Sequence, residues 1–265
     1  MDTVTHNGIT GTESCVDALP EFFQYVEIEI STACNLRCRY CPNSISDRGL
    51  VKNNRQMPTA LFNRLIDELS EIGFAGEFHP HLYNEPLLDD RLSDLLQYVR
   101  KKLEGCKIAL FTNGLLLTLD KYLELAACGV DSICVTRHQS ADPPHIAAIF
   151  RHRENHGDDN VKLDYVQEGL DEEILFNRGG AIPLKEVYNI TRRCTWPSYY
   201  LTINYKGDVL LCCNDYFGTF PIGNVMHHSI MEVWGKTCNK LLREHLSKDV
   251  SKINLCRKCM IGIVR

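Results

Sequence analysis

The sequence is constrained most by a regular alternation of strand-like and helix-like segments before residue 180. Short apolar and β-branched runs predict strands at Tyr25–Thr32, Glu77–Tyr83, Lys107–Thr112, Ser132–Thr136 and Val161–Val166. Amphipathic stretches between them predict helices at Pro58–Ile72, Asp90–Leu103, Thr118–Cys128 and Pro144–His156. Right-handed helical crossovers place such strands in a parallel sheet, so we expect an α/β fold curled into a partial TIM-like (β/α) barrel. Its active site is expected at the carboxyl ends of the strands.

The pattern changes after about residue 180. The segments Tyr199–Tyr205 and Val209–Cys213 predict a β-hairpin around a Lys-Gly turn, and a helix is predicted at Ser229–His245. We therefore expect three parts, namely an N-terminal extension at 1–24, a core domain at 25–180 and a small C-terminal domain at 181–265.

Composition and charge exclude several classes of function. The net charge of −5 comes from mixed charges without a basic stripe, so we expect no nucleic-acid partner. No segment approaches the roughly 20 apolar residues needed to span a bilayer, and the N-terminus lacks a signal-peptide pattern. We therefore expect a cytoplasmic protein without a membrane partner. Thiols stay reduced in that compartment, so the 13 cysteines indicate metal binding rather than disulfides.

A first set of cysteines, Cys34-x3-Cys38-x2-Cys41, directly follows the first predicted strand. Three thiolates on one loop leave one iron of a [4Fe–4S] cluster open, since such clusters normally take four thiolates. An outside ligand is able to bind that iron. The alternative is a zinc site that takes a distant fourth ligand.

This first set resembles the signature of the radical S-adenosylmethionine (SAM) superfamily, CxxxCxΦC, with Tyr40 as the aromatic residue. The resemblance implies that SAM binds the open iron and that Tyr40 helps to seat the adenine. Asn84-Glu85-Pro86 is similar to the GGE-type loop that receives the SAM amino group, with Asn84 in place of the usual glycine. Thr112 and Asn113 resemble a polar turn that meets the methionyl or ribose part of SAM, although Asn113-Gly114 is also a common turn dipeptide.

A second set of cysteines resembles the SPASM family. The pattern Cys194-x12-Gly207-x4-Cys212 is followed by Gly223-Asn224-Val225, Glu232-Val233-Trp234 and a CxxC pair at Cys256 and Cys259. The chain ends six residues later, so we expect the shortened twitch form, a β-hairpin plus a helix. The resemblance implies that these four cysteines fully ligate one auxiliary [4Fe–4S] cluster that transfers electrons. Cys213 is an alternative to Cys212, and a structural zinc site is an alternative to the cluster.

The resemblance also implies the reaction class. SAM cleavage gives a 5′-deoxyadenosyl radical that abstracts hydrogen, and an auxiliary cluster that accepts an electron makes the outcome a two-electron oxidation. In architecture the chain resembles the twitch-type dehydrogenase that oxidises 2-deoxy-scyllo-inosamine, an aminocyclitol, and more distantly the sulfatase-maturating enzymes. We expect a small polar substrate, because only about 24 residues precede the first strand and leave no leader-peptide domain. An external one-electron donor such as flavodoxin or ferredoxin is also implied.

Three alternatives remain open at the level of sequence. A redox-neutral epimerase or dehydratase would use a thiol such as Cys213 or Cys134 to return hydrogen. A peptide could be the substrate instead of a small molecule. A non-catalytic protein would hold structural zinc at both cysteine sets.

The remaining candidates are polar residues near predicted strand ends. His79, His81 and Tyr83 share one face of the second strand, while His138, Asp164 and Gln167 lie near later strand ends. We predict that His79 and His81 contact substrate and that Gln167 contacts the cofactor, although a strand histidine is often only hydrogen-bonded in the core. Arg178, in a glycine-containing turn before Cys194, is predicted to bind substrate oxygens, with an interdomain salt bridge as the alternative.

Overall fold

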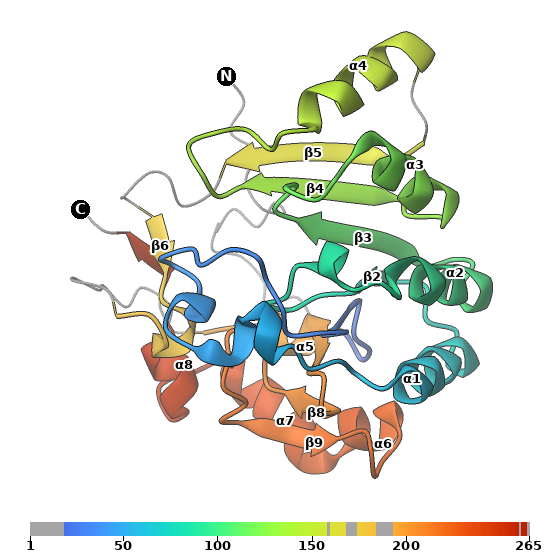
Figure 1. Cartoon of the computed structure of the whole chain (residues 1–265). Coiled ribbons are helices and arrows are strands. Elements are labelled where there is room, and N and C mark those ends of the chain that lie inside the picture. The colour runs from blue at the N-terminus through green and yellow to red at the C-terminus, as the bar shows by residue number, and fades with distance from the viewer. Residues whose placement is uncertain (1–18, 158–159, 168–173, 184–192, 260, 264–265) are drawn as a thin grey trace.

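The computed structural model describes residues 19–157, 160–167, 174–183, 193–259 and 261–263, and its centre is one open eight-stranded sheet. The strand order is β5-β4-β3-β2-β1-β7-β8-β9 (Figure 1). Five parallel strands match the predicted ones, with bounds β1 Tyr25–Ile28, β2 Glu77–His79, β3 Lys107–Thr112, β4 Ser132–Arg137 and β5 Lys162–Gln167. The predicted α/β fold is confirmed. The first two strands are shorter than predicted, because the chain turns away from the sheet before the polar segments that follow.

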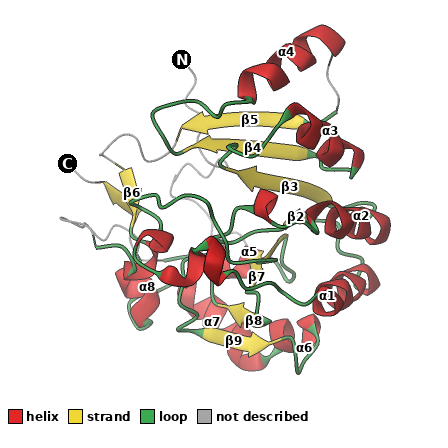
Figure 2. Cartoon of the chain, in the orientation of Figure 1, coloured by secondary structure: helices red, strands yellow, loops and turns green. Residues whose placement is uncertain are grey.

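Each side of the sheet has its own chemistry because side chains alternate along a strand. Val26 and Ile28 of β1 are completely buried and pack in the apolar core with leucines of the first helix. Glu27, between them, lies on the opposite face. The helices follow their strands as predicted (Figure 2), with bounds α1 Thr59–Glu71, α2 Leu92–Lys102, α3 Leu119–Ala127 and α4 Ile146–His156.

The C-terminal part continues the same sheet. Strand β7 (Tyr200–Ile203) pairs parallel to β1, and β8 (Asp208–Leu210) and β9 (Pro221–Asn224) follow antiparallel. The predicted hairpin is confirmed, and Gly207 in its turn has φ +83°, a conformation that side chains with a Cβ rarely adopt. The domain borders at residues 24 and 180 stay a prediction, and strands from both sides of the second border share one sheet.

The single helix predicted at Ser229–His245 is wrong. The segment forms two helices, α6 (Ile230–Gly235) and α7 (Thr237–Leu246), separated by Lys236, whose φ of −53° and ψ of 132° are not helical. Side chains of α7 cap the end of α6, since Arg243 donates to the Trp234 carbonyl at 3.0 Å and Asn239 donates to the Val233 carbonyl at 2.8 Å. These bonds satisfy carbonyls that a continuous helix would have paired internally.

Several short elements were not predicted. Strand β6 (Ile174–Phe176) pairs antiparallel to β10 (Ile261–Ile263). The other elements are single turns, with bounds α5 Trp196–Tyr199, α8 Asn254–Lys258, η1 Pro42–Ser44, η2 Asp47–Gly49, η3 Val51–Asn53, η4 Pro86–Leu88 and η5 Arg178–Gly180. They lie in the loops that carry the candidate site residues.

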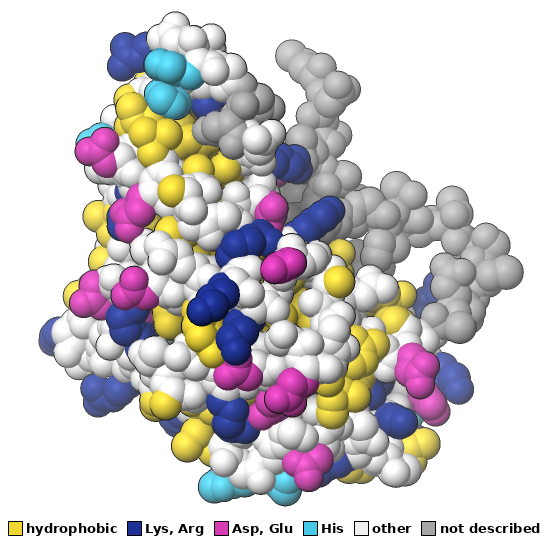
Figure 3. Space-filling view, turned by 90° about the vertical axis from the view of Figure 1, so that its right-hand side faces the viewer, with side chains coloured by type: hydrophobic (Ala, Val, Ile, Leu, Met, Phe, Trp, Pro, Cys, Tyr) yellow, Lys and Arg dark blue, Asp and Glu magenta, His cyan; other side chains and the backbone are white. Residues whose placement is uncertain are grey.

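The outer surface beside α1 and α2 carries interspersed charges of both signs (Figure 3). Several form ion pairs, such as Lys102 with Asp67 at 2.7 Å and Arg64 with Glu68 at 2.6 Å. In the part of the chain that the structure describes, no helix has the length and apolar character that crossing a membrane requires.

The packing of β7 against the core predicts a matched pair of stability effects. Leu201 of β7 is fully buried, and we expect Leu201→Ala to lower the free energy of unfolding by about 2–5 kcal/mol. Leu241 of α7 is 59% exposed, and Leu241→Ala should change it by less than about 0.5 kcal/mol. Denaturant unfolding of both variants measures the difference, and equal effects would contradict this packing.

Candidate active site

The loop after β1 holds the first cysteine set at the carboxyl end of the sheet. The Cys34 amide donates to the Gly49 carbonyl at 3.0 Å, and the Cys41 amide donates to the Cys38 carbonyl at 2.8 Å. Burial, with smaller contributions from nearby Glu85, Cys41 and Cys38, raises the pKa of the Cys34 thiol to about 12. Three thiols close enough to influence one another need positive charge to ionise, which an iron cluster supplies.

Glu85 joins the loop after β2 to the loop after β3. Its Oε1 accepts from the Thr112 hydroxyl at 2.7 Å and the Leu87 amide at 3.2 Å, and its Oε2 accepts from the Asn113 amide at 2.8 Å. The Glu85 amide donates to the Ala33 carbonyl at 2.8 Å, next to Cys34. The sequence predicted a carboxylate available to the SAM amino group. In the structure this carboxylate is engaged in the hydrogen bonds that brace the loops. These contacts do not favour the predicted role of Glu85 in binding the SAM amino group.

The side-chain amide of Asn84 has a hydrogen-bond donor that is available to a ligand. Its Oδ1 accepts from the Leu82 amide at 3.0 Å, whereas its buried Nδ2 has no hydrogen-bond partner among the described residues. A buried amide without a partner costs free energy, which an acceptor on a bound ligand would recover. The methionyl carboxylate of SAM offers such an acceptor, so the residue found in place of the usual glycine fits the cofactor.

The adenine seat predicted at Tyr40 lies beside the ends of β3 and β4. The Tyr40 hydroxyl and His138 Nδ1 form a hydrogen bond, and their ring centroids are 5.8 Å apart. Asn113 Nδ2 donates to Asn35 Oδ1 at 2.7 Å, which ties the β3 loop to the first cysteine loop. A small hollow here is lined by Leu36, Asn113, Leu115, Arg137, His138 and Gln139.

A cavity of about 420 Å³ lies at the other end of the sheet, beside Tyr25, Gly76 and Lys107 at the amino ends of the strands. Its lining includes no predicted cofactor or cluster ligand.

The second cysteine set comes from three separate segments. Cys194 precedes α5, Cys212 follows β8, Cys256 lies in α8 and Cys259 ends that helix. Burial, with smaller contributions from nearby Cys194 and Cys259, raises the pKa of the Cys256 thiol to about 12. Burial also raises the pKa of Cys212, which the adjacent Cys213, Cys259 and Cys194 raise further. The fold therefore brings all four thiols into one neighbourhood.

The choice between zinc and a cluster concerns spacing. Among the described side chains, no three of the His, Cys, Asp and Glu residues are placed to hold a single metal ion. Zinc binds thiolates about 2.3 Å from one ion. A [4Fe–4S] cluster binds each thiolate at a different iron and so holds them farther apart.

The inner face of the sheet places three predicted site residues around one unpredicted carboxylate, Glu27. Burial raises the pKa of Glu27, while His79, the Thr202 hydroxyl at 2.7 Å and Arg178 lower it. Burial also raises the pKa of Cys213, and nearby Glu27 raises it further. His79, Arg178 and Cys213 therefore all lie close enough to Glu27 for their charges to interact with it.

Glu27 was not predicted, because it belongs to neither cysteine set and lies within a strand rather than at its end. The residue is 8% exposed, and its Oε2 accepts a hydrogen bond from the Thr202 hydroxyl. The available signal was an acidic residue between Val26 and Ile28, within an otherwise apolar strand. A buried carboxylate with a raised pKa is typical of a functional site.

The two histidines differ in what they contact. His79 Nε2 pairs with Glu77 Oε1 at 2.7 Å, and its ring stacks with His81 at 5.8 Å between centroids. Burial lowers the pKa of His81 to about 3, with a smaller contribution from His79, so His81 is neutral near pH 7. Its buried Nδ1 has no partner among the described residues.

Other predicted residues lie at the edges of this group. Tyr83 donates from its hydroxyl to the Cys213 carbonyl at 2.7 Å. Asp164 pairs with Lys162 at 2.7 Å on β5. Gln167 ends that strand, but its side chain lies outside the described part of the chain. The roles of all these residues stay predictions.

Known proteins share this arrangement. Residues 28–162 match the Radical SAM superfamily, and residues 194–260 match the SPASM iron–sulfur cluster-binding domain. The S-adenosyl-L-methionine-dependent 2-deoxy-scyllo-inosamine dehydrogenase of Niallia circulans is 29% identical over 249 residues, which cover 91% of this chain and 94% of that protein.

Solved structures give the same result. The crystal structure of BtrN in complex with AdoMet and 2-DOIA has a TM-score of 0.77 and 29% identity, covering 90% of this chain and 93% of that one. Native anSMEcpe with bound AdoMet has a TM-score of 0.57 and 15% identity, covering 90% and 89%. The second likeness concerns the fold alone.

The Glu85 brace leads to a prediction about cofactor binding. Thr112→Val removes the hydroxyl that donates to Glu85 and should weaken SAM binding about tenfold, because a hydrogen bond to a charged group contributes about 1.5–3 kcal/mol. Thr112→Ser keeps the hydroxyl and should bind SAM like the natural chain. Equilibrium dialysis of the reconstituted proteins measures this, and equal affinities for the two variants would count against the brace.

Proposed function

Because the chain belongs to the radical SAM superfamily, we propose that it is a dehydrogenase that oxidises a hydroxyl-bearing carbon of a small polar molecule, such as an aminocyclitol or a sugar. The observation that carries the proposal is the proximity of four clustered thiols to the polar group around Glu27. Arg178 affects the pKa of both Glu27 and Cys259, so it lies between the inner face and the second cysteine set. An electron leaving a substrate there has an acceptor site next to it.

The matches confirm the predicted family, fold and cofactors, namely SAM, a SAM-binding [4Fe–4S] cluster and an auxiliary cluster. When bound, these groups supply a 5′-deoxyadenosyl radical that abstracts hydrogen and a centre that accepts an electron. We assign Cys34, Cys38 and Cys41 to the first cluster and Cys194, Cys212, Cys256 and Cys259 to the auxiliary one. Tyr40, Asn84, Thr112 and Asn113 would hold SAM.

The inner-face residues would bind the substrate and take its proton. The Arg178 guanidinium would donate to substrate oxygens, and Glu27 would accept from a hydroxyl or an ammonium group. Oxidation of an alcohol carbon also releases the hydroxyl proton, which needs an acceptor. The pKa of Glu27 is raised by burial whereas that of His81 is about 3, so Glu27 is the stronger base of the two.

Relatives support a small polyhydroxylated substrate. The Niallia circulans protein is named for 2-deoxy-scyllo-inosamine, and the BtrN complex contains 2-DOIA. The polar side chains of Glu27, His79 and Arg178 would offer several hydrogen-bonding groups to such a molecule. A flavodoxin or ferredoxin would supply electrons. The cytoplasm would suit the twelve described cysteines, which form no disulfide.

One observation favours a second candidate, a redox-neutral epimerisation. Burial and nearby Glu27 raise the pKa of Cys213, which keeps the thiol protonated, and nearby Arg178 lowers that pKa. A thiol there could return a hydrogen atom to a substrate radical. Solvent deuterium at the reacting carbon would identify this outcome.

Product analysis tests the main proposal. With 2-deoxy-scyllo-inosamine, SAM and a reductant, the reconstituted chain should form a ketone and 5′-deoxyadenosine in about equal amounts. Cys194→Ala should still cleave SAM and should lower ketone formation at least about tenfold, since a ligand of the electron acceptor is lost. A product with no net oxidation would contradict the dehydrogenase proposal.

We expect Glu27 to lower the stability of the fold and to support catalytic activity. Glu27→Gln removes a buried charge, so we expect a higher Tm and a kcat/KM at least about tenfold lower. Because burial raises the pKa of Glu27, the natural chain loses stability as pH rises, and the Tm difference should shrink at acid pH, where this carboxyl is protonated.

Glu124, the exposed ion-pair partner of Lys121, provides the control. Glu124→Gln should leave kcat/KM unchanged, because Glu124 lies on the outer helix α3. Thermal unfolding from pH 4 to 8 and steady-state kinetics measure both effects. Unchanged kinetics in Glu27→Gln would remove Glu27 from the proposed site.

A further inference from the structure

Three residues outside the proposed catalytic group connect the two cysteine loops. Asn43 lies two residues after Cys41, and Tyr216 lies three residues after Cys213. The Tyr216 hydroxyl donates to Asn43 Oδ1 at 2.9 Å, and Asn43 Nδ2 donates to the Tyr83 carbonyl at 2.8 Å. Tyr83 then donates from its hydroxyl to the Cys213 carbonyl at 2.7 Å. With the chain from Cys213 to Tyr216, these three hydrogen bonds close a ring.

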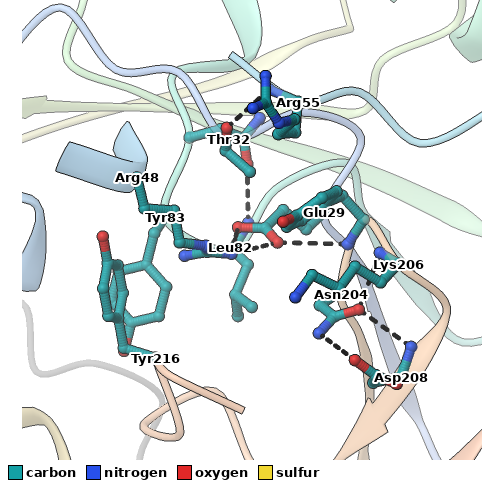
Figure 4. Close-up of polar contacts among 12 residues, drawn as sticks. Glu29, Thr32, Arg48, Arg55, Leu82, Tyr83, Asn204, Lys206, Asp208 and Tyr216 are labelled. Atoms are coloured by element: carbon teal, nitrogen blue, oxygen red, sulfur yellow. Dashed lines mark hydrogen bonds and ion pairs between the residues drawn. The ribbon is translucent and has the colours of Figure 1, made fainter. Parts of the chain in front are cut away.

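The two tyrosines of this ring support each other directly. Their rings meet edge to face with centroids 4.8 Å apart, a favourable aromatic geometry (Figure 4). Asn43, Tyr83 and Tyr216 are all buried, so water does not replace a lost partner. Removing one hydroxyl therefore leaves a buried acceptor unpaired and loosens the ring.

A buried ion pair holds the same ring from the side. Arg48, in η2 of the first cysteine loop, pairs with Glu29 at 2.5 Å, and the Glu29 side chain is completely buried. The Arg48 guanidinium also lies over the Tyr216 ring, 4.7 Å from its centroid (Figure 4). Glu29 accepts from the Tyr205 amide at 3.3 Å, at the turn after β7. Arg48 thus ties the first loop to both β1 and the C-terminal part.

Asn43 also has no space in which to rearrange on one side. A Cβ added to Gly49 would lie 2.3 Å from Asn43 Oδ1, so any larger residue there must displace the amide. Gly49 itself accepts the Cys34 amide through its carbonyl. The ring and the first cluster loop are therefore packed as one unit.

We propose that Asn43, Tyr83 and Tyr216 are positioning residues that fix the auxiliary-cluster loop relative to the SAM-cluster loop. The proposal rests on the proposed function for its kinetic consequence. Electron transfer from the substrate requires the loop that carries Cys212 to keep a fixed place beside the reacting carbon. When that place is lost, a further electron from the external donor and a solvent proton end the radical, and SAM is consumed without oxidised product.

The test compares three tyrosine-to-phenylalanine variants of the reconstituted holoenzyme. Tyr216→Phe and Tyr83→Phe each remove one bond of the ring and keep the aromatic ring. Tyr98→Phe is the matched control, because its hydroxyl donates to Asp67 at 2.9 Å between outer helices. The measurements are the midpoint potential and EPR spectrum of the auxiliary cluster, and the ratio of 5′-deoxyadenosine to oxidised product.

Both ring variants should shift the auxiliary-cluster potential and raise that ratio by about threefold or more, whereas Tyr98→Phe should change neither. The double variant should resemble each single one, because one broken bond already opens the ring. Gly49→Ala displaces Asn43 without removing any hydrogen-bonding group and should act like Tyr216→Phe.

The outcomes separate the two proposals. If Tyr216→Phe, Tyr83→Phe and Gly49→Ala all match Tyr98→Phe in potential, spectrum and ratio, the positioning proposal is overturned and the dehydrogenase proposal stands. If the natural chain oxidises no substrate, the proposed function fails, and the potential and spectrum still decide whether the ring positions the auxiliary loop.

Discussion

The pairing of β1 with both β2 and β7 is the interaction on which the rest of the structure depends. All three strands run parallel, so their carboxyl ends meet at one edge of the sheet. The first cysteine loop leaves β1 at this edge, and the Asn84-Glu85 loop follows β2. On the other side, β7 leads through its hairpin to Cys212. One strand therefore places the SAM site on one flank and the auxiliary site on the other.

Three buried carboxylates show how this edge is organised. Burial raises the pKa of Glu27, Glu29 and Glu85, yet each is compensated differently. Glu29 pairs with Arg48, and Glu85 accepts hydrogen bonds from Thr112 and two backbone amides. The carboxylates of Glu29 and Glu85 are therefore both occupied by contacts that hold the fold together. Glu27 accepts a hydrogen bond from Thr202, and the proposed function assigns it to the substrate.

The sequence predicted the parts of the fold that depend on local pattern. The strands at Lys107–Thr112 and Ser132–Thr136 and their helices follow from periodicity, and the two cysteine sets follow from their resemblance to family patterns. The break at Lys236 was missed because it depends on Asn239 and Arg243 reaching back to carbonyls of α6. The link between Asn43 and Tyr216 spans 173 residues, and no local pattern encodes it. The role of Glu85 as a brace likewise appears only when three loops are seen together.

The central claim is that one chain holds two clusters with different ligation, one open to SAM and one closed. Mössbauer spectroscopy of the anaerobically reconstituted chain, with and without SAM, tests it most directly. We predict about eight irons per chain in two [4Fe–4S] clusters, with SAM changing the signal of one iron in one cluster only. A chain that holds about four irons, or one in which SAM changes no iron signal, would contradict the account.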